Sequence, residues 1–357
     1  MKNESHGGYY IMNKNKKLGV NKPVANKLKT FAHIMEGLAL FLAVINKIPP
    51  KKNVEKNPFI VGKGKLPLVA SHRAGAINNP ENTLLAFREC VLLNGSDIIE
   101  SDLHLTKDGY LVLSHDRYID RTCNINGDIS LEEVLKLCED ESKRHYINDM
   151  TLAELQQYNF GYYFTDKNGN RIYKDTKDFA EKGLKIITVE QLFDLFYESH
   201  PDLMFTLDIK DDGETGFKVC KLLNDILNKY PNYKDQVSVG TFHDEIGKEL
   251  DNKYPDLIKG APPYTAAFFV ITQYLKINLF CNRNFACLQI PTSHDFKIFE
   301  LPLVNKSLVE RAHLRNIAVH YWTINDPNDM RTLIELGVDC IMTDDPILLN
   351  QVLDEYR

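Results

Sequence analysis

The chain has 357 residues, 43% of them hydrophobic, and a formal net charge of -6 at neutral pH. This length and an ordinary hydrophobic content suit one large globular domain or two small ones. The acidic balance leaves no basic surface of the kind that nucleic acid requires, so we exclude nucleic acid as a partner. Seven cysteines without a Cys-x-x-Cys pair argue against a disulfide framework or a structural zinc site, and favour buried thiols in a reducing, cytoplasmic compartment.

Residues 1–66 differ in composition from the rest and are treated as an N-terminal extension. Lysine and asparagine dominate residues 13–29, and the apolar stretch that follows predicts an amphipathic helix over residues 31–48. Its uninterrupted apolar part, Gly37–Ile45, is too short to cross a bilayer, which needs about 20 residues. The expected membrane contact is therefore an interfacial helix with flanking lysines on anionic lipid; the alternatives are packing on the folded domain or disorder. Residues 49–66 are interpreted as a linker.

From residue 67 onward, short apolar runs alternate with helical patterns. The strand candidates are Leu68–Ser71, Ile98–Asp102, Leu111–His115, Met204–Ile209, Val237–Gly240, Leu257–Ala261, Cys287–Ile290, Val319–Thr323 and Cys340–Thr343. The helix candidates are Asn82–Leu93, Val189–Tyr197, Phe217–Lys229, Leu308–Arg315 and Asn328–Leu336. Such alternation predicts a parallel sheet with helical crossovers, and residues 67–357 have the length of one (β/α)8 TIM barrel.

Nine strand candidates compete for eight barrel positions. Only a short turn with Gly109 separates Ile98–Asp102 from Leu111–His115. A parallel crossover needs about a dozen residues or more, so these two strands are predicted to form an antiparallel hairpin above the barrel mouth. The hairpin would return His115 to the mouth, beside the carboxylates that end the first of the two strands.

Residues 117–187 form an insertion after this hairpin. It holds two helix starts of capping-box type, at Ser130 and Thr151. It also holds an aromatic group made of Tyr158, Phe160, Tyr162, Tyr163 and Phe164. Loops after barrel strands lie on the catalytic face, so the insertion is interpreted either as a substrate-selecting cap or as a cluster that packs on the barrel.

Carboxylates gather at the predicted strand ends. Glu100 and Asp102 are two residues apart on one strand, so their side chains share a face, and Asp208 ends a later strand. Three carboxylates at a barrel mouth repel one another unless a cation lies between them, and oxygen ligands suit Ca²⁺ or Mg²⁺. A Glu-x-Asp pair alone is weak evidence for a cation site, and its default interpretation is a solvated or salt-bridged strand end.

Histidines and cationic side chains flank these carboxylates. His72 and His115 are candidates for general acid and base, because histidine transfers protons near neutral pH. Arg73 and Lys210 are candidates for binding phosphate oxygens, with salt bridges to the carboxylates as the alternative. Trp322, the only tryptophan, ends a strand and is predicted to line the site, with a core position as the alternative. Six further histidines lack a supporting motif and are expected to be structural: His104, His145, His243, His294, His313 and His320.

The order and spacing of these motifs resemble the glycerophosphodiester phosphodiesterase family over roughly residues 66–350. The matching residues are His72-Arg73, Pro80-Glu81-Asn82-Thr83, Glu100-x-Asp102, His115-Asp116, Asp208-x-Lys210 and two closing strands at Trp322-Thr323-Ile324-Asn325 and Gly337–Pro346. Two positions depart from the family pattern. Ala74 stands where Gly is usual, although Gly75 follows, and Asp208 stands where Glu is usual.

The resemblance implies metal-dependent hydrolysis of glycerophosphodiesters to glycerol 3-phosphate and an alcohol on a (β/α)8 barrel. It implies that Glu100, Asp102 and Asp208 hold the divalent cation, Ca²⁺ or Mg²⁺, with Glu81 as a further ligand or a neighbour of the site. Asn82 is expected to cap the helix that follows it.

By the same resemblance, His72 and His115 would be the general acid and base, and Arg73 and Lys210 would share the charge of the phosphate. Two other functions stay open at this point. One is a lysophospholipase D at a membrane surface, favoured by the N-terminal apolar stretch and the aromatic insertion. The other is a non-catalytic barrel that binds lipid or a partner, which would have no need for both histidines and the carboxylates together.

Overall fold

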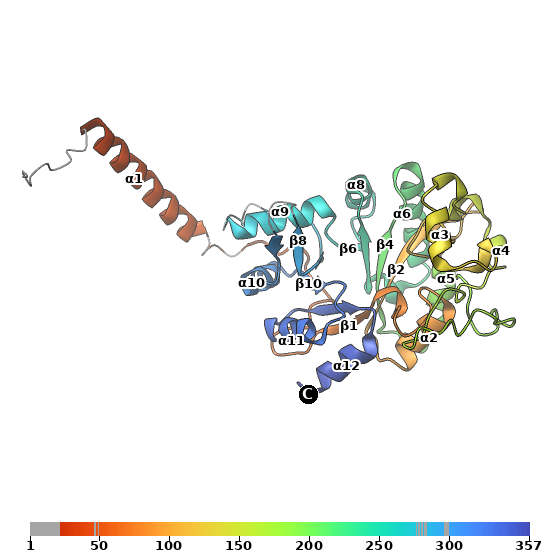
Figure 1. Cartoon of the computed structure of the whole chain (residues 1–357). Helices are drawn as coiled ribbons and strands as arrows, with labels where there is room; N and C mark the ends of the chain where they lie inside the picture. Colours follow the sequence, from red (N-terminus) through yellow and green to blue (C-terminus); the bar gives the residue numbers. More distant parts are fainter. Residues whose placement is uncertain are drawn as a thin grey trace, which may run out of the picture. The chain divides into compact units, whose positions relative to one another are not determined.

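The structure is a computed structural model that describes residues 22–45, 48, 50–275, 277, 279, 281, 284–295 and 300–357. Two compact units make up the chain, Met1–Ile48 and Pro49–Arg357. The second unit is built on eight parallel strands (Figure 1). These are β1 (Leu68–Ser71), β2 (Ile98–Leu105), β4 (Met204–Ile209), β5 (Val237–Thr241), β6 (Ile258–Lys259), β7 (Cys287–Ile290), β10 (Ala318–Tyr321) and β11 (Cys340–Thr343).

The eight strands follow chain order around the sheet, β6-β5-β4-β2-β1-β11-β10-β7. A parallel bridge between Gly260 and Cys287 joins its two ends. The predicted (β/α)8 barrel is therefore confirmed as a nearly closed ring. Outside the insertion, the described α-helices of this unit are α2 (Leu84–Leu92), α5 (Val189–Phe196), α6 (Gly213–Leu227), α7 (Pro231–Lys234), α8 (Asp244–Lys253), α9 (Pro263–Tyr274), α10 (Lys306–Leu314), α11 (Pro327–Leu336) and α12 (Pro346–Asp354).

The ninth strand candidate lies outside the ring, as predicted. Strand β3 (Leu111–Leu113) pairs antiparallel with the end of β2, with Leu113 opposite Leu103. It ends two residues earlier than predicted, so His115 follows the strand. A second hairpin, β8 (Ser293–Asp295) with β9 (Glu300–Pro302), was not predicted from the sequence.

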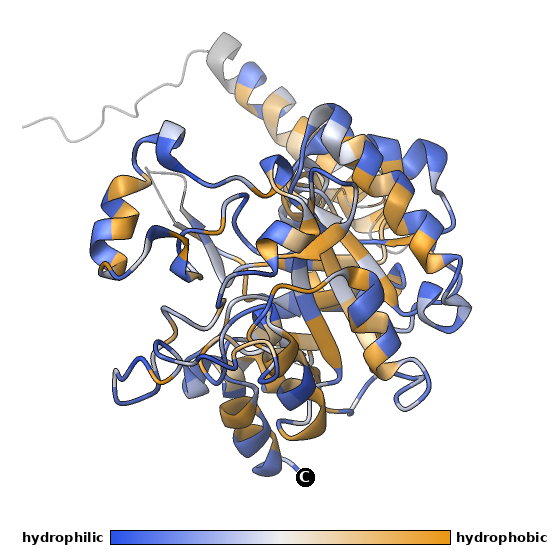
Figure 2. Cartoon of the chain, turned by 90° about the vertical axis from the view of Figure 1, so that its right-hand side faces the viewer, coloured by the Kyte–Doolittle hydropathy of each residue, from blue (hydrophilic) through white to orange (hydrophobic). Residues whose placement is uncertain are grey.

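Side-chain alternation along the strands separates the outer core from the barrel interior. On β2, Ile99 and Leu103 join the core between sheet and helices, whereas Glu100 and Asp102 line the cavity inside the barrel. In Figure 2, hydrophobic residues run along the strands and the helix faces packed on them, while the connecting loops are mostly hydrophilic. This alternation is what brings polar side chains of different strands together at one end of the barrel.

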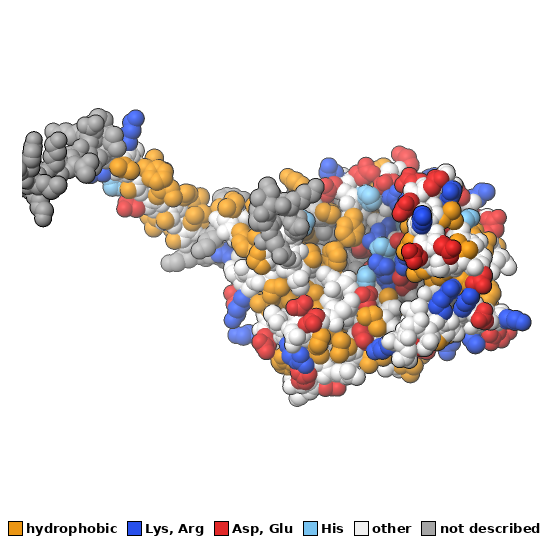
Figure 3. Space-filling view, viewed as in Figure 1, with side chains coloured by type: hydrophobic (Ala, Val, Ile, Leu, Met, Phe, Trp, Pro, Cys, Tyr) orange, Lys and Arg blue, Asp and Glu red, His pale blue; other side chains and the backbone are white. Residues whose placement is uncertain are grey.

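The N-terminal unit is represented by helix α1 (Lys22–Ile45), which begins earlier than the helix predicted over residues 31–48. Within it, Asn26–Ile45 is a 20-residue segment long and apolar enough to cross a membrane, so the objection based on length was wrong. Its large apolar side chains are exposed, and hydrophobic side chains cover much of the helix in Figure 3. Leu28, Phe31, Ile34, Leu40 and Phe41 are each at least half exposed.

Residues interpreted as a linker are instead part of the barrel unit, which begins at Pro49. Phe59 is completely buried, and its ring lies 5.8 Å from the ring of His320 inside the barrel. Asn57 donates from Nδ2 to the backbone carbonyls of Ala286 and Asn316 at 2.8 and 2.9 Å. Ala286 and Asn316 lie just before the strands β7 and β10, so the segment closes the N-terminal end of the barrel.

The insertion contains α3 (Leu131–Leu137) and α4 (Leu152–Leu155), and both predicted capping boxes are present. Tyr158 and Phe160 belong to one apolar cluster, and Tyr162 and Tyr163 belong to another. The guanidinium of Arg171 lies over the rings of both of these tyrosines, at 4.4 and 4.6 Å. None of the five predicted aromatic residues lines the described cavity, so in the described part of the chain they serve packing.

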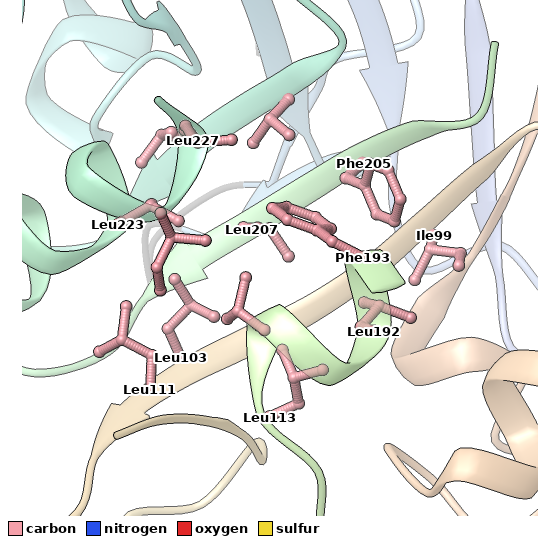
Figure 4. Packing of buried hydrophobic residues seen from close by; sticks show 14 of the residues in the cluster. Ile99, Leu103, Leu111, Leu113, Leu192, Phe193, Phe205, Leu207, Leu223 and Leu227 are labelled. Atoms are coloured by element: carbon pink, nitrogen blue, oxygen red, sulfur yellow. The ribbon is translucent and has the colours of Figure 1, made fainter. Parts of the chain in front are cut away.

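The outer core is aromatic where α5 and α6 pack on β2 and β4 (Figure 4). The ring of Phe193 from α5 lies 5.0 Å from Phe205 of β4 and 5.3 Å from Tyr233, in edge-to-face arrangements. Complete burial of such a side chain contributes about 1.5–3 kcal/mol to stability. Tightly packed side chains therefore lie behind the strand ends that carry the polar residues.

All seven cysteines are buried, as predicted.

Candidate active site

Three carboxylates meet inside the barrel mouth. Glu100 and Asp102 come from β2 and Asp208 from β4, where Asp208 is directly opposite Asp102 in the strand register. One oxygen from each carboxylate lies within 4.8 Å of the others. Gly240 on β5 leaves room for them, because a Cβ atom there would lie 1.9 Å from Asp208 Oδ1.

This acidic cluster fits a cation. Asp102 Oδ2 and Asp208 Oδ1 are buried and have no hydrogen-bond partner among the residues that the structure describes. Burial and mutual repulsion raise the pKa of Glu100 to about 8, and burial and the charge of Asp102 raise the pKa of Asp208 to about 6. Buried acceptors without donors are unfavourable, and a hard divalent cation such as Ca²⁺ or Mg²⁺ prefers such oxygen ligands. Although Asp208 is shorter than the Glu that is usual in the family, its side chain still reaches the other two carboxylates, because one oxygen of each lies within 4.8 Å of the others.

Lys210 and Arg73 contact the cluster from two sides. Lys210 Nζ lies 2.8 Å from Asp102 Oδ1, and the charges of Asp102 and Asp208 raise the pKa of this lysine although its burial opposes the shift. Arg73 donates its backbone N–H to Glu100 Oε2 at 2.8 Å. The predicted salt bridge is thus present for Lys210, whereas Arg73 binds the cluster through its backbone.

His72 and His115 are held by the same kind of contact. His72 Nδ1 lies 2.6 Å from Asp344 Oδ1, and His115 Nδ1 lies 2.8 Å from Asp116 Oδ1. In both rings the Nδ1 atom is occupied by an aspartate, so Nε2 is the atom left for proton transfer. His72 Nε2 is 4.0 Å from Glu100 Oε2. Burial lowers the pKa of His72, but the charges of Glu100 and Asp344 outweigh burial and raise it overall.

Glu81 lies apart from the acidic cluster. Arg121 donates to both of its carboxylate oxygens, at 2.9 and 2.6 Å, and the guanidinium of Arg73 lies 3.5 Å from it. Of the two roles expected for Glu81, these contacts support that of a neighbour of the site.

The turn after β1 has a left-handed backbone at three consecutive residues. Arg73, Ala74 and Gly75 have φ angles of 49°, 66° and 83°. Ala74 therefore occupies a position that favours glycine, as the departure from the family pattern suggested. Asn82 does not cap α2: its φ is 56° and its side chain accepts from Ser101, whereas Thr83 accepts from the N–H of Ala86.

A cavity of about 570 Å³ connects these groups with an apolar wall. The polar side holds His72, Arg73, His115, Lys210 and the acidic cluster. The opposite side is lined by Ala266, Val270 and Ile271 of α9, with Ile290 of β7 and Leu301 of β9. In Figure 3, histidine and basic side chains gather around a hollow of the barrel unit, with hydrophobic side chains beside it.

Comparison with known proteins decides how this site is classified. The model of the glycerophosphoryl diester phosphodiesterase family matches residues 72–348. This chain belongs to that family. It is a phosphodiesterase-family hydrolase whose acidic cluster occupies the matched region.

Individual relatives cover most of the barrel. A glycerophosphodiester phosphodiesterase of Caldanaerobacter subterraneus is 28% identical over 80% of this chain and 97% of its own length. Human lysophospholipase D GDPD1 is 24% identical over 80% of this chain and 86% of its own. An Oleispira antarctica phosphodiesterase, solved with its product sn-glycerol-3-phosphate, superimposes with a TM-score of 0.56 at 20% identity, covering 81% of this chain and 97% of that one.

Trp322 lines the cavity and contacts a second aromatic residue at its rim. Phe242, which follows β5 and is 50% exposed, lies 6.2 Å from the Trp322 ring in an edge-to-face arrangement. Lys210 Nζ lies 4.5 Å from the Phe242 ring. Phe242 therefore joins Trp322 in the wall of the cavity, although no motif of this phosphodiesterase family pointed to Phe242.

Several other residues of the site were missed from the sequence. Asp116 and Asp344 matched family motifs, but no role was predicted for them. The position of Asp116 next to His115, and that of Asp344 within the motif of a closing strand, could have indicated one. His294, expected to be structural, lines the cavity. No sequence motif pointed to a role for Arg121.

Proposed function

We propose that this protein hydrolyses glycerophosphodiesters to glycerol 3-phosphate and an alcohol, with Glu100, Asp102 and Asp208 holding a Ca²⁺ or Mg²⁺ ion. The observation that carries the proposal is the pair of buried oxygens of Asp102 and Asp208 without a hydrogen-bond partner among the described residues, in a cavity that two aspartate-bound histidines also line. A cation bound there supplies charge stabilisation to the phosphate during hydrolysis.

The chain's own residues would divide the remaining work. Lys210 and Arg73 line the same cavity and would share the negative charge of the phosphate. One of His72 and His115 takes a proton from the nucleophile, which is water or a neighbouring glycerol hydroxyl, and the other protonates the leaving oxygen. Trp322 and Phe242 would pack against the carbon atoms of the alcohol.

The test is release of glycerol 3-phosphate from glycerophosphocholine by the purified full-length chain. Turnover should require Mg²⁺ or Ca²⁺, disappear in EDTA and disappear in His115→Ala. His33→Ala is a matched control, because this histidine lies on α1 with its side chain 77% exposed. Full turnover in EDTA, or in His115→Ala, would contradict the proposal.

A second candidate, hydrolysis of lysophospholipids, is favoured by the apolar side of the cavity. A glycerophosphodiester that lacks an acyl chain has no use for a wall of Val270, Ile271 and Leu301. The choice is made by comparing kcat/KM for glycerophosphocholine and lysophosphatidylcholine in one assay. A preference for the lysolipid supports the second candidate, and a preference for the water-soluble diester contradicts it.

We also propose that α1 attaches the chain to a membrane, with the barrel in the cytoplasm. The exposed apolar side chains of α1 and the length of Asn26–Ile45 support this location. Membrane fractionation of the full chain, compared with a chain that lacks residues 1–48, tests the attachment. Recovery of both chains in the soluble fraction would contradict it.

A further inference from the structure

Arg121 connects two parts of the active site that lie far apart in the sequence. Its Nε donates to Asp116 Oδ2 at 2.5 Å, and its two terminal nitrogens donate to Glu81 at 2.9 and 2.6 Å. Asp116 uses its other oxygen to bind His115 Nδ1 at 2.8 Å. Each of the three guanidinium nitrogens therefore donates to a carboxylate, and the two bonds to Glu81 form the bidentate pair in which arginine binds a carboxylate most strongly.

The backbone around Arg121 is fixed by buried residues on both sides. Ile119 and Asp120 are fully buried, and so is Cys123. Asp120 accepts hydrogen bonds from the His145 backbone N–H and from Asn126, at 2.9 Å each. The guanidinium is thus presented by a rigid turn at the start of the insertion, and its position does not depend on a mobile loop.

The charge of Arg121 changes the acidity of both partners. Burial would raise the pKa of Glu81, yet the hydrogen bonds and charge of Arg121 hold it below its usual value. Burial also opposes the ionisation of Asp116, and contacts with His115 and Arg121 together lower its pKa. Both carboxylates are consequently anionic around neutral pH, and Asp116 is kept as an acceptor for the histidine.

We infer that Arg121 is a positioning residue for the reaction, which orients His115 through Asp116 and links it to Glu81 and Arg73. The inference rests on the proposed function, since it assigns a role around the same two histidines. Without Arg121, Asp116 would lose the donor that fixes its second oxygen. Among the described residues, buried Glu81 would keep only the 3.5 Å contact with Arg73. Proton transfer at His115 would then depend on a ring that is no longer held in one orientation.

The first measurement compares Arg121→Ala and Arg121→Lys with the wild type in the full-length chain. We expect kcat for glycerophosphocholine to fall roughly 10–100-fold in Arg121→Ala, as for other residues that orient a functional group, with KM changed far less. Arg121→Lys should lose an intermediate amount, because lysine keeps the charge but cannot bind both carboxylates in a fork. Methylguanidinium added to Arg121→Ala should restore part of kcat.

Arg144→Ala is the matched control. Arg144 belongs to the same insertion and has a similarly buried side chain, but its hydrogen bonds go to Glu141 and the backbone carbonyl of Cys138 rather than to Asp116 or Glu81. It should retain wild-type kcat, and thermal unfolding of each variant separates a lost orientation from a lost fold. If Arg121→Ala does not fold, Arg121→Lys and Asp116→Asn carry the test, and both should lower kcat more than KM rises.

A double-mutant cycle with Asp116→Asn decides whether Arg121 acts on His115 through Asp116. In an Asp116→Asn background, which keeps His115, Arg121→Ala should cause little further loss of kcat, because the carboxylate through which it acts is already gone. Additive losses, a change confined to KM, or an equal loss in Arg144→Ala would overturn the assignment. Wild-type turnover in the same assay tests the proposed function separately: an inactive wild type defeats that function, whereas an active wild type with additive losses defeats only the role of Arg121.

Discussion

The polar side of the cavity is made of strand ends, whereas the opposite side is made of helix α9 and the β8–β9 hairpin. Every carboxylate and histidine assigned to the chemistry comes from β2, β4 or the turns that follow β1 and β3. Among the α-helices that the structure describes, α9 alone has no Asp, Glu, Lys or Arg. The two sides thus separate the reaction from the choice of substrate, and changes on each side should have different consequences.

The largest effect is expected on the polar side and should not depend on the substrate. His72→Ala removes a proton-transfer group, so kcat should fall by roughly 10²–10⁴-fold for glycerophosphocholine and for lysophosphatidylcholine alike. Steady-state kinetics with both substrates measures this. His294 also lines the cavity but is not one of the two aspartate-bound histidines, so His294→Ala should lower kcat far less. A loss at His72 restricted to one substrate would break the division between the two sides.

A change on the apolar side should affect lipid substrates alone. Ile271→Asp places a charge on the wall lined by α9, and we expect kcat/KM for lysophosphatidylcholine to fall about tenfold or more. The rate with glycerophosphocholine should hardly change. Leu275→Asp, one turn further on and 57% exposed but outside the cavity lining, is the control. Equal losses with both substrates would mean that the wall also supports the polar side.

The acidic cluster predicts how stability responds to pH and metal. Glu100 has a pKa of about 8 in the folded chain against 4.5 in an unfolded one, so the folded state keeps a proton that the unfolded state has lost. The stability of the metal-free protein should therefore decrease as pH rises from about 4.5 to about 8. Thermal unfolding in EDTA at pH 5 and pH 8 checks this, with Glu100→Gln as the reference that lacks this contribution.

The same titration should make metal binding stronger at higher pH, because protons and the cation compete for the carboxylates. Mg²⁺ or Ca²⁺ should accordingly raise the unfolding temperature more at pH 8 than at pH 5. An equal effect of metal at both values would contradict the assignment of the cluster as the binding site.

The smallest effect is expected at Ala74. A left-handed backbone at a residue with a Cβ is unfavourable by about 1–2 kcal/mol, which glycine would relieve. Glycine would also lose a fully buried methyl group, worth about 0.8 kcal/mol, and about 0.5–1 kcal/mol through its freer backbone. Ala74→Gly should therefore change the free energy of unfolding by less than about 1 kcal/mol. Urea denaturation measures it, and a gain of several kcal/mol would show that the strain is larger than this balance allows.

The sequence predicted the barrel because its signals are local. Apolar runs with helical spacers between them, and a turn too short for a crossover at Gly109, identify eight strands and one hairpin without any tertiary information. The acid, base and carboxylate residues were also predictable, since each stands next to a strand end and within an ordered motif.

Two of the missed features, helix α9 and Arg121, lack a periodic pattern. Helix α9 has apolar residues on all sides and no charged face, so the spacing that reveals an amphipathic helix is absent. Arg121 is one arginine within a polar turn, and only the folded chain shows that Glu81 and Asp116 converge on it. Its role depends on contacts between distant residues, which no local spacing encodes.

Phe59 has a practical consequence for separating the apolar helix from the enzyme. Its ring closes the end of the barrel opposite the mouth, and the main chain before it is already bonded to the barrel at Asn53, whose N–H donates to the Arg315 carbonyl at 2.8 Å. A truncation at residue 66 would leave that end open and expose His320 and its apolar neighbours to water. A truncation just before Pro49 removes α1 and leaves the barrel intact. Truncated chains that begin later should aggregate for reasons unrelated to any membrane.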